Sequence, residues 1–553
     1  MPESQLKKRS KVVKKKSTAY LRIGTRYRAN KADKHYDAVV VGSGPGGLAT
    51  AVCLSKMGWK VAVFEQHYSA GGFTHAYGRN GYEWDVGVHY IGDMGSTRTR
   101  ARQVFDFVTG GNLKWASMGR VYDRVYINNE MFEFPAGKAE LITALIDRFP
   151  DEQSAIQQYF KLVDLASRGM TAFTLNKLVP KWLGRVWLHN KIPGLLFEPT
   201  LQVLERLTSN KKLIATLTTQ WGDAGLSPRD SSFLIHAIIA KHYLYGGYYP
   251  IGGASKIAET QLPAIQKNGG EVFTYARVEQ ILFKDNRAAG VRMADGNRIS
   301  SPVVVSAVGV PLTFNRLIPE AQANHLGWKQ KQREVAPSMS HLCLYIGLKH
   351  TAESLELPRC NFWIYPDEHS DANVDRFEQD MNQPFPLVYV SFPSAKDPTW
   401  QERYPGTATI EIVAPAKYQW FEQWKDETWG KRGSDYDALK EHLAERLLNE
   451  LYAKLPQLDG KIDYWELSTP LSTQYFNEYA QGEIYGLDHN PNRFKQDWLR
   501  PKTAIKGFYL SGQDILICGV VGGVMSGLMT SVAILGVWKS SRLLRLMKQQ
   551  LSD

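Results

Sequence analysis

Residues 36–65 contain every part of a nucleotide-binding βαβ unit in one continuous run. An apolar strand is predicted at 38–41, a helix at 48–57 and a second buried strand at 61–64. The turn between the first strand and the helix has G-x-G-x-x-G spacing and consists of Gly42, Ser43, Gly44, Pro45, Gly46 and Gly47. A glycine-rich turn without a ligand is the alternative, but the flanking strands and helix favour a dinucleotide site in a Rossmann-type α/β domain.

Each glycine of this turn has a mechanical task in binding a pyrophosphate. Gly42 makes the tight turn, Gly44 lets phosphates approach bare backbone, and Gly47 lets the helix pack close to the strand. The N-terminus of the helix presents free N–H groups and the positive end of its dipole to the phosphates. Glu65 closes the second strand, where an acid can accept hydrogen bonds from ribose hydroxyls.

The chain of 553 residues is too long for one hydrophobic core, and its length predicts about two to four domains. Its four cysteines, Cys53, Cys343, Cys360 and Cys518, show no C-x-x-C pairing and no histidine at metal-ligand spacing. We therefore expect a reduced, cytosol-facing protein without a metal.

The net charge of +12 is concentrated at the N-terminus. The first 36 residues hold twelve Lys or Arg against Glu3 and Asp33, so the rest of the chain carries only +2. Residues 1–17 include KKRSKVVKKK and lack the apolar core of a signal peptide. A solvated, disordered arm is one interpretation, and an electrostatic tether to anionic lipid headgroups is the other. Nucleic acid is not an expected partner, because no basic-aromatic fold motif accompanies the run.

The stretch after Glu65 continues the expected cofactor site. Two adjacent glycines there allow backbone to lie along a pyrophosphate and the ring it carries. The expected contacts are Gln66, Gly71, Gly72 and Phe73. Together with a D-x-G-x-H-Y motif at 85–90, this stretch resembles the FAD-binding start of the phytoene desaturase, carotenoid isomerase and retinol saturase group of flavoproteins, with retinol saturase the most similar. The resemblance implies FAD as the cofactor, with Gly87, His89 and Tyr90 near the flavin.

Two later segments resemble the same flavoproteins. Residues 216–296 are similar to the retinol saturase group in sequence and order, which implies that the backbone of Val278 meets the adenine. A G-x-D turn ahead of a glycine-rich helix near the C-terminus implies contacts from Gly512, Asp514, Val521 and Gly522. The dipole of that helix would stabilise negative charge on a reduced flavin. Three distant segments are therefore expected to converge on one FAD.

The periodicity and composition of the remaining segments indicate strands, helices and one long apolar run. Alternation at 341–347 and 408–413 predicts strands of a half-exposed sheet, and 437–455 predicts a long amphipathic helix. Residues 169–197 mix Trp182 and Trp187 with basic side chains, which is typical of a membrane-interface segment or of surface helices. The uncharged run 515–538 is long enough to span a membrane, but its glycines favour a buried helix under the cofactor.

These features predict an α/β protein in which a Rossmann-type FAD-binding domain, of the glutathione-reductase-like flavoprotein fold, is interleaved with an α+β substrate domain. The basic arm is expected at 1–35. The FAD-binding domain is expected at 36–130, 246–310 and 466–553, and its last part includes the C-terminal helix. The substrate domain is expected at 131–245, a helical and membrane-facing part, and at 311–465, which holds its sheet.

The resemblance also implies the chemistry, a reaction at a carbon–carbon double bond of a hydrophobic polyene or another unsaturated lipid. Saturation requires hydride from reduced flavin and a proton from a protic group nearby. The candidate donors are His89, Tyr90, Tyr248 and Tyr249. The alternative for His89 is that it only orders its loop, and the alternative for Tyr248 and Tyr249 is that they form pocket wall.

A saturase is the favoured function. The alternatives are a desaturase or cis-trans isomerase of carotenoid-like substrates, a redox-silent FAD-dependent fatty-acid hydratase, and a flavin-binding protein without turnover. Because the sequence has one full G-x-G-x-x-G, we expect no NADPH domain, and electrons would come from visiting NAD(P)H, a quinone or a partner protein. The basic and aromatic-basic segments favour a cytoplasmic protein attached peripherally to the inner face of a membrane.

Overall fold

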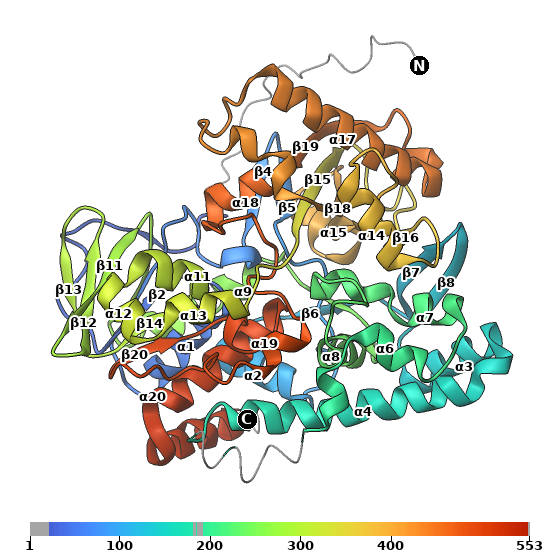
Figure 1. Ribbon diagram of the computed structural model, residues 1–553. Coiled ribbons are helices and arrows are strands. Elements are labelled where there is room, and N and C mark those ends of the chain that lie inside the picture. Colours follow the sequence, from blue (N-terminus) through green and yellow to red (C-terminus); the bar gives the residue numbers. More distant parts are fainter. Residues whose placement is uncertain (1–20, 181–183, 185–191, 551–553) are drawn as a thin grey trace.

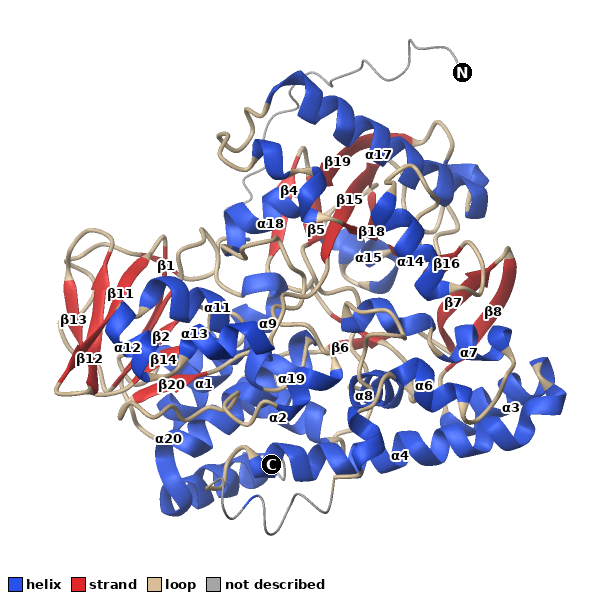
Figure 2. Cartoon of the chain, viewed as in Figure 1, coloured by secondary structure: helices blue, strands red, loops and turns tan. Residues whose placement is uncertain are grey.

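The computed structural model describes residues 21–180, 184 and 192–550. Residues 1–20, which carry most of the expected basic arm, lie outside these ranges. Trp182 and Trp187 of the aromatic-basic segment also lie outside them. Within the described part, Figure 2 shows strands gathered in two separate regions with helices around and between them.

A six-stranded parallel sheet contains both strands of the N-terminal βαβ unit (Figure 1). Strand β2 (Ala38–Val41), helix α1 (Pro45–Lys56) and strand β3 (Val61–Phe64) lie close to the predicted positions. The other strands are β1 (Thr25–Arg26), β10 (Glu271–Thr274), β14 (Val304–Ser306) and β20 (Phe508–Leu510). The spatial order is β1-β10-β3-β2-β14-β20, and every neighbouring pair is parallel. Distant parts of the chain thus build one sheet, and the predicted interleaved α/β fold is confirmed.

A three-stranded antiparallel sheet and a broken helix flank this core. The sheet consists of β11 (Val278–Lys284), β12 (Arg287–Met293) and β13 (Arg298–Ser300). Residues 256–266 form two short helices, α9 (Lys256–Glu259) and α10 (Leu262–Gln266). Pro263 has no N–H to donate to the preceding turn, so the helix must restart there.

A seven-stranded sheet forms the second region of strands. Its order is β19 (Ile462–Ser468), β15 (Ser340–Leu348), β18 (Ala408–Ala416), β17 (Val388–Ser391), β16 (Asn361–Tyr365), β7 (Val121–Ile127) and β8 (Glu130–Pro135). All pairs are antiparallel except β16 with β7.

The expectation of a half-exposed sheet is wrong for the centre of this sheet, because all nine residues of β15 are buried. On one face Leu342, Leu344 and Ile346 belong to the same hydrophobic cluster as residues of the long helix α17 (Gly433–Lys454). On the other face Cys343 and Tyr345 pack against Trp84 of β5 (Tyr82–Asp85), which pairs with β4 (Ala76–Arg79). The strand alternates in sequence, but both of its faces are covered.

Helices pack against the β16–β7–β8 end of this sheet. They are α3 (Lys138–Arg148), α4 (Gln153–Asn176), α6 (Thr200–Glu205), α7 (Lys211–Leu217) and α8 (Phe233–Tyr243). The short 3-10 helix η6 (Thr219–Ala224) lies between α7 and α8 in sequence and carries Asp223 towards the interior. A two-stranded ribbon of β6 (Trp115–Ser117) and β9 (Tyr248–Pro250) completes this part.

The uncharged run near the C-terminus lies in helix α20 (Gly519–Gln550), and α2 (Arg100–Val108) packs beside it. By length and composition alone α20 could cross a membrane, and it is the one described helix that meets this criterion. Its first half packs on α1, so closely that a Cβ atom on Gly527 would lie 2.6 Å from the Cβ of Ala49. The helix changes direction at Gly536, and Val537 and Trp538 beyond it are 84% and 90% exposed.

Candidate functional site

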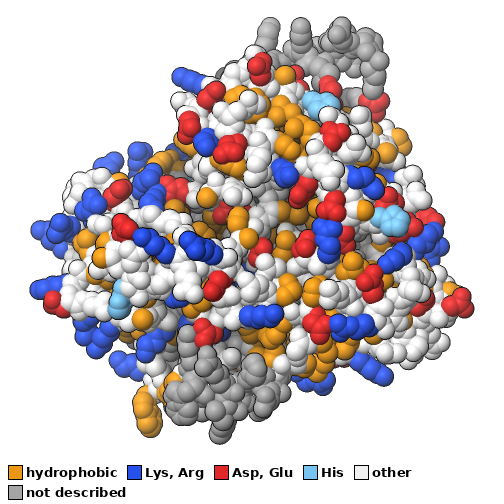
Figure 3. Space-filling view, in the orientation of Figure 1, with side chains coloured by type: hydrophobic (Ala, Val, Ile, Leu, Met, Phe, Trp, Pro, Cys, Tyr) orange, Lys and Arg blue, Asp and Glu red, His pale blue; other side chains and the backbone are white. Residues whose placement is uncertain are grey.

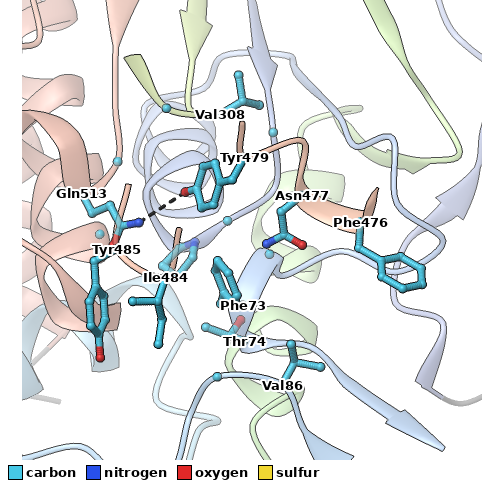
Figure 4. Close-up of a pocket in the computed structure, with 18 of the residues that line it drawn as sticks. Phe73, Thr74, Val86, Val308, Phe476, Asn477, Tyr479, Ile484, Tyr485 and Gln513 are labelled. Atoms are coloured by element: carbon cyan, nitrogen blue, oxygen red, sulfur yellow. Dashed lines mark hydrogen bonds between the residues drawn. The ribbon is translucent and has the colours of Figure 1, made fainter. Parts of the chain in front are cut away.

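One large cavity lies where the three predicted cofactor segments meet. Val41 and Phe64, at the carboxyl ends of β2 and β3, line it, and this is the edge of a parallel sheet at which ligands bind. The residues that line the cavity come from the glycine-rich turns and from the seven-stranded sheet. Figure 4 shows Tyr479 and Gln513 pointing towards each other beside Phe73, and the Gln513 amide donates a hydrogen bond to the Tyr479 hydroxyl at 3.3 Å.

Three glycine turns from distant parts of the sequence touch at one end of this cavity. A Cβ atom built on Gly46 would lie 2.8 Å from both the Cα and the N of Gly512, and 3.2 Å from the carbonyl oxygen of Gly523. By contrast, a Cβ on Gly44 would meet nothing within 4 Å. Close contact on one side and open space on the other form the cradle that a pyrophosphate needs against bare backbone.

Two helix N-termini face the same end of the cavity. Helix α1 begins at Pro45 without a side-chain cap, and Gly44, Pro45 and Gly46 line the cavity. Helix α20 begins at Gly519, which lines the cavity together with Val520 and Gly523. Uncapped N–H groups and two converging helix dipoles favour negative charge here. The residues present therefore fit a dinucleotide.

Glu65 is held where an acid could meet a ribose. Its carboxylate accepts hydrogen bonds from the backbone N–H of Ser43 at 3.0 Å, the Ser43 hydroxyl at 2.7 Å and the N–H of His67 at 2.8 Å. The Ser43 hydroxyl also accepts from the N–H of Gly71. Ser43 and Gly71 therefore act by holding Glu65 and the glycine turn, and neither lines the cavity.

Asp514 also lines the cavity, but its carboxylate is engaged by backbone. One oxygen accepts from the N–H of Val310 at 2.7 Å and the other from the N–H of Leu487 at 3.0 Å. The side chain is 2% exposed. In this structure Asp514 fastens three segments of the chain around the cavity.

The other expected cofactor residues divide between cavity wall and support. Those that line the cavity are Gly42, Gly44, Pro45, Gly46, Glu65, Gln66, Gly72, Phe73, Gly87, His89, Val278, Gly512 and Asp514. Gly47 faces β2 instead, since a Cβ there would lie 2.1 Å from the Gly42 carbonyl oxygen. Val521 and Gly522 do not line the cavity, because the side of α20 that faces it carries Val520 and Gly523. The sequence pattern predicted where this helix begins, but not which side of the helix lines the cavity.

His89 lies against a buried carboxyl group. Its Nδ1 is 2.8 Å from Oε2 of Glu411, which is fully buried in β18 and also accepts from the N–H of Asp85 at 2.7 Å. Burial, and then the charge of Lys396, lower the pKa of His89 to about 3. Burial likewise raises the pKa of Glu411 to about 8. At neutral pH the pair therefore holds a protonated carboxyl next to a neutral imidazole.

The three tyrosines expected as proton donors do not line the cavity. Tyr90 is buried, stacks on Tyr243 at 4.2 Å and donates to Asp123 at 3.1 Å. Tyr249 is buried and donates to Asp85. Tyr248 lies in β9, and its hydroxyl contacts the backbone carbonyl of Tyr245. Tyr248 and Tyr249 lie in β9, which pairs with β6, and a strand of three residues carries too little pattern to show in the sequence that neither side chain lines the cavity.

Sequence reasoning missed the apolar half of the cavity. Its wall comes from the seven-stranded sheet and from the chain after α18 (Pro470–Asn477), and it consists of Met339, His341, Trp363, Leu387, Tyr389, Val413, Pro415, Ile484 and Tyr485. The alternation of β15 and β18 was a visible signal for strands. It did not show which face would meet the cofactor end, because that depends on how two sheets are placed in space.

Asp223 is a second residue that sequence reasoning missed. It lines the cavity, and its partner Tyr90 lies between it and Asp123, with the Tyr90 hydroxyl 3.5 Å from Asp223 and 3.1 Å from Asp123. Burial, and then the charge of Asp123, raise the pKa of Asp223 to about 8. Asp123 accepts hydrogen bonds from Asn361 and Gln220 at 2.9 Å each, which oppose the effect of burial, and its pKa is about 6. At neutral pH the two carboxyl groups therefore differ in charge.

Comparison with known proteins places this architecture among oxidoreductases. A family model described as an NAD(P)-binding Rossmann-like domain matches residues 40–108. The chain is 37% identical over 534 residues to the all-trans-retinol 13,14-reductase of Homo sapiens, covering 92% of this chain and 87% of that protein. It is 24% identical over 583 residues to the chloroplastic prolycopene isomerase of Arabidopsis thaliana, covering 97% of this chain and 90% of that protein.

A solved structure with the same fold is an oxidoreductase from Methanosarcina mazei. It shares 16% sequence identity and superposes with a TM-score of 0.57, covering 89% of this chain and 98% of that chain. At this identity the likeness establishes the fold.

Proposed function

The chain belongs to the all-trans-retinol 13,14-reductase family, and on that premise we propose that it is an FAD-dependent oxidoreductase that saturates a carbon–carbon double bond of a hydrophobic polyene. The observation that carries this proposal is one cavity with two unlike ends. One end is a cradle of glycine turns and helix N-termini, and the other is a wall of aromatic and aliphatic side chains. A dinucleotide and a long apolar molecule can therefore meet in one cavity.

The chain supplies a distinct group of residues for each part of FAD. Gly44 and Gly46, at the N-terminus of α1, are placed for the pyrophosphate, and Glu65 for a ribose. Val278 and Arg316 would contact the adenine, and Arg316 pairs with Glu478. Gly519 and Gly523, at the N-terminus of α20, would support the electron-rich edge of the flavin. When bound, the flavin supplies hydride for the double bond.

The protein's own contribution is to exclude water, position the polyene and provide a proton. Trp363, Leu387 and Val413 give the cavity an apolar wall in which a polyene replaces water. His89 lines the cavity as a neutral imidazole held by Glu411, so it can orient its loop and a bound molecule by hydrogen bonding. With a pKa of about 3 for its charged form, His89 carries no ready proton at neutral pH.

Isomerisation is the second candidate function, because the chain also aligns along nearly all its length with a prolycopene isomerase. An isomerase would return substrate of unchanged mass, whereas a saturase adds two hydrogens. A redox-silent hydratase would add one water, and a flavin-binding protein without turnover would leave the polyene unchanged.

The deciding experiment begins with the purified protein and its bound chromophore. The flavin is reduced anaerobically with dithionite and then mixed with all-trans-retinol. We expect bleaching on reduction, return of the yellow colour on addition of the polyene, and a product heavier by two hydrogens. A protein that neither carries nor takes up FAD, or a reduced flavin that the polyene does not reoxidise, would contradict the proposal.

The source of electrons and the cellular location form part of the same proposal. Lys and Arg side chains gather over the three-stranded sheet (Figure 3), where Lys284, Arg287 and Arg298 are exposed. This charge supports encounter with an anionic donor such as NAD(P)H or an acidic partner protein.

A peripheral position on the inner face of a membrane is supported by a different surface. Val537 and Trp538 are exposed beyond the bend of α20, and Lys539, Arg542 and Arg545 follow them. Aromatic and aliphatic side chains beside cations match the interface of an anionic bilayer. A substrate that dissolves in the bilayer would then enter from that bilayer.

A further inference from the structure

We propose that Asp223 is the catalytic acid of this site, delivering the proton to the carbon next to the one that receives hydride, and that Asp123 is the positioning carboxylate that keeps it protonated. The inference rests on the proposed function, which requires a proton donor in the cavity. His89 is neutral and three candidate tyrosines lie outside the cavity wall, so the donor must be another group.

Four acidic residues line the cavity, and three of them have strong partners. Glu65 accepts from Ser43 and His67, Asp514 accepts from two backbone N–H groups, and Glu478 pairs with Arg316 and Arg277. These contacts already engage the carboxyl oxygens of all three. Asp223 forms no ion pair with a Lys or Arg of the described residues, and its side chain receives hydrogen bonds from tyrosine hydroxyls only.

The groups that face Asp223 are neutral apart from one. The neutral groups are Tyr90, Tyr243, Tyr365, Tyr389, Tyr485 and Cys518, and burial raises the pKa of each. The remaining group is Asp123, a carboxylate steadied by two amides. Of two carboxyl groups linked through one phenol hydroxyl, the one that accepts more hydrogen bonds carries the single negative charge at the lower free energy, and this is Asp123. The proton therefore stays on Asp223.

The backbone fixes where this carboxyl group sits. Gly222 packs closely against the apolar wall of the cavity. A Cβ atom on Gly222 would lie 2.6 Å from Cδ2 of Leu387 and 3.0 Å from Cζ3 of Trp363. The carbonyl oxygen of Asp223 accepts from the thiol of Cys518 at 3.3 Å, just before α20 begins at the flavin end. Asp223 is thus held between the apolar wall and the flavin end, where the reacting double bond must lie.

The proposed step balances in atoms and electrons. The π bond breaks and two C–H bonds form, one from the hydride of reduced flavin and one from the proton of Asp223. The polyene is reduced and the flavin is oxidised. Asp223 is left as a carboxylate and regains a proton from water, while a two-electron donor of the NAD(P)H or reduced-quinone class reduces the flavin again.

The test measures reduction of the flavin and its reoxidation by the polyene separately in the Asp223→Asn variant. Asp230→Asn is the matched control. Asp230 lies in the loop that follows η6, is exposed and pairs with Arg229. We expect Asp223→Asn to keep its FAD and to be reduced by dithionite at the wild-type rate. Reoxidation by saturating all-trans-retinol should fall by about 10²–10⁴-fold, as for loss of a general acid. Asp230→Asn should behave as wild type in both halves.

Two further readouts distinguish an acid from a structural or substrate-anchoring residue. Infrared difference spectra between pH 6 and 9 should show the band of a protonated carboxyl that is missing in Asp223→Asn. The reoxidation rate of the wild type should decline above about pH 8, and Asp123→Asn should move that decline to lower pH, because the charge that keeps Asp223 protonated is gone.

Several results would overturn the assignment. One is reoxidation of Asp223→Asn at the wild-type rate, and another is absence of the carboxyl band. A third is a raised KM for all-trans-retinol with unchanged saturated rate, which would make Asp223 an anchor for the hydroxyl group. If reduced wild-type protein fails to reduce any polyene, the proposed function itself is wrong, while the infrared spectra still report whether Asp223 holds the proton.

Discussion

At the scale of single residues, the pairing of His89 with Glu411 makes stability depend on pH. The folded protein raises the pKa of Glu411 from its ordinary value of 4.5 to about 8, chiefly by burial. The folded state therefore holds a proton that the unfolded chain releases between these values. Stability from this group is complete below about pH 4.5 and is lost as the pH rises through 8. His89 acts in the opposite direction below about pH 6.5, since the unfolded chain alone gains a proton there.

The Glu411→Gln variant should remove this dependence. A glutamine can still accept from Asp85 and donate to Nδ1 of His89. We expect the free energy of unfolding to fall from pH 5 to pH 8 less steeply in the variant than in the wild type, with a difference on the order of 3 kcal/mol over the interval. Urea unfolding at four pH values measures it, with the exposed Glu445→Gln as the control. Parallel curves for wild type and Glu411→Gln would show that the carboxyl is ionised in the folded protein.

At the scale of elements, the features that could be predicted from the sequence are those that depend on residues close together in the chain. Strand β2, its turn and helix α1 were predictable because glycine spacing and apolar runs are local. Asp223 was not, since its character comes from Asp123, one hundred positions earlier, and from a tyrosine between them. Tyr249 was a candidate proton donor because it follows a motif, but its hydroxyl donates a hydrogen bond to Asp85. Local pattern identified the cofactor end, and tertiary contacts decided the substrate end.

The contact of three glycine turns predicts the effect of one methyl group. Ala at position 46 would place a Cβ 2.8 Å from two backbone atoms of Gly512, so α1 or the turn after β20 must shift. We expect Gly46→Ala to fold with its sheet intact but to bind FAD at least about tenfold more weakly, a cost of about 1.4 kcal/mol or more. The ratio of flavin to protein absorbance after gel filtration measures this. Gly194→Ala, where a Cβ meets nothing within 4 Å, should retain its flavin. Full occupancy in Gly46→Ala would mean that the turns move apart freely.

At the scale of the whole molecule, the two sheets share one cavity, and the surface that we propose contacts a membrane lies on α20, the helix whose N-terminus faces that cavity. The proposed polyene substrate has almost no solubility in water and would reach the apolar wall from a lipid phase. The bend at Gly536 turns Val537 and Trp538 outward while the first half of α20 stays packed on α1. The same helix can therefore support the cofactor and contact the bilayer without spanning it.

Replacing both exposed side chains, Val537→Ser with Trp538→Ser, should weaken binding to phosphatidylserine vesicles. Withdrawing these two side chains from the interface forfeits about 2–4 kcal/mol, or at least a tenfold loss in affinity in flotation assays. Flavin content should be unchanged, since neither residue lines the cavity. Tyr475→Ser, which removes an exposed aromatic elsewhere, is the control. Removal of residues 1–17 should weaken binding at low salt only, because an electrostatic tether is screened. If the double variant floats with vesicles as well as wild type while the truncated chain does not float at all, the basic tail alone carries the attachment and α20 has no part in it.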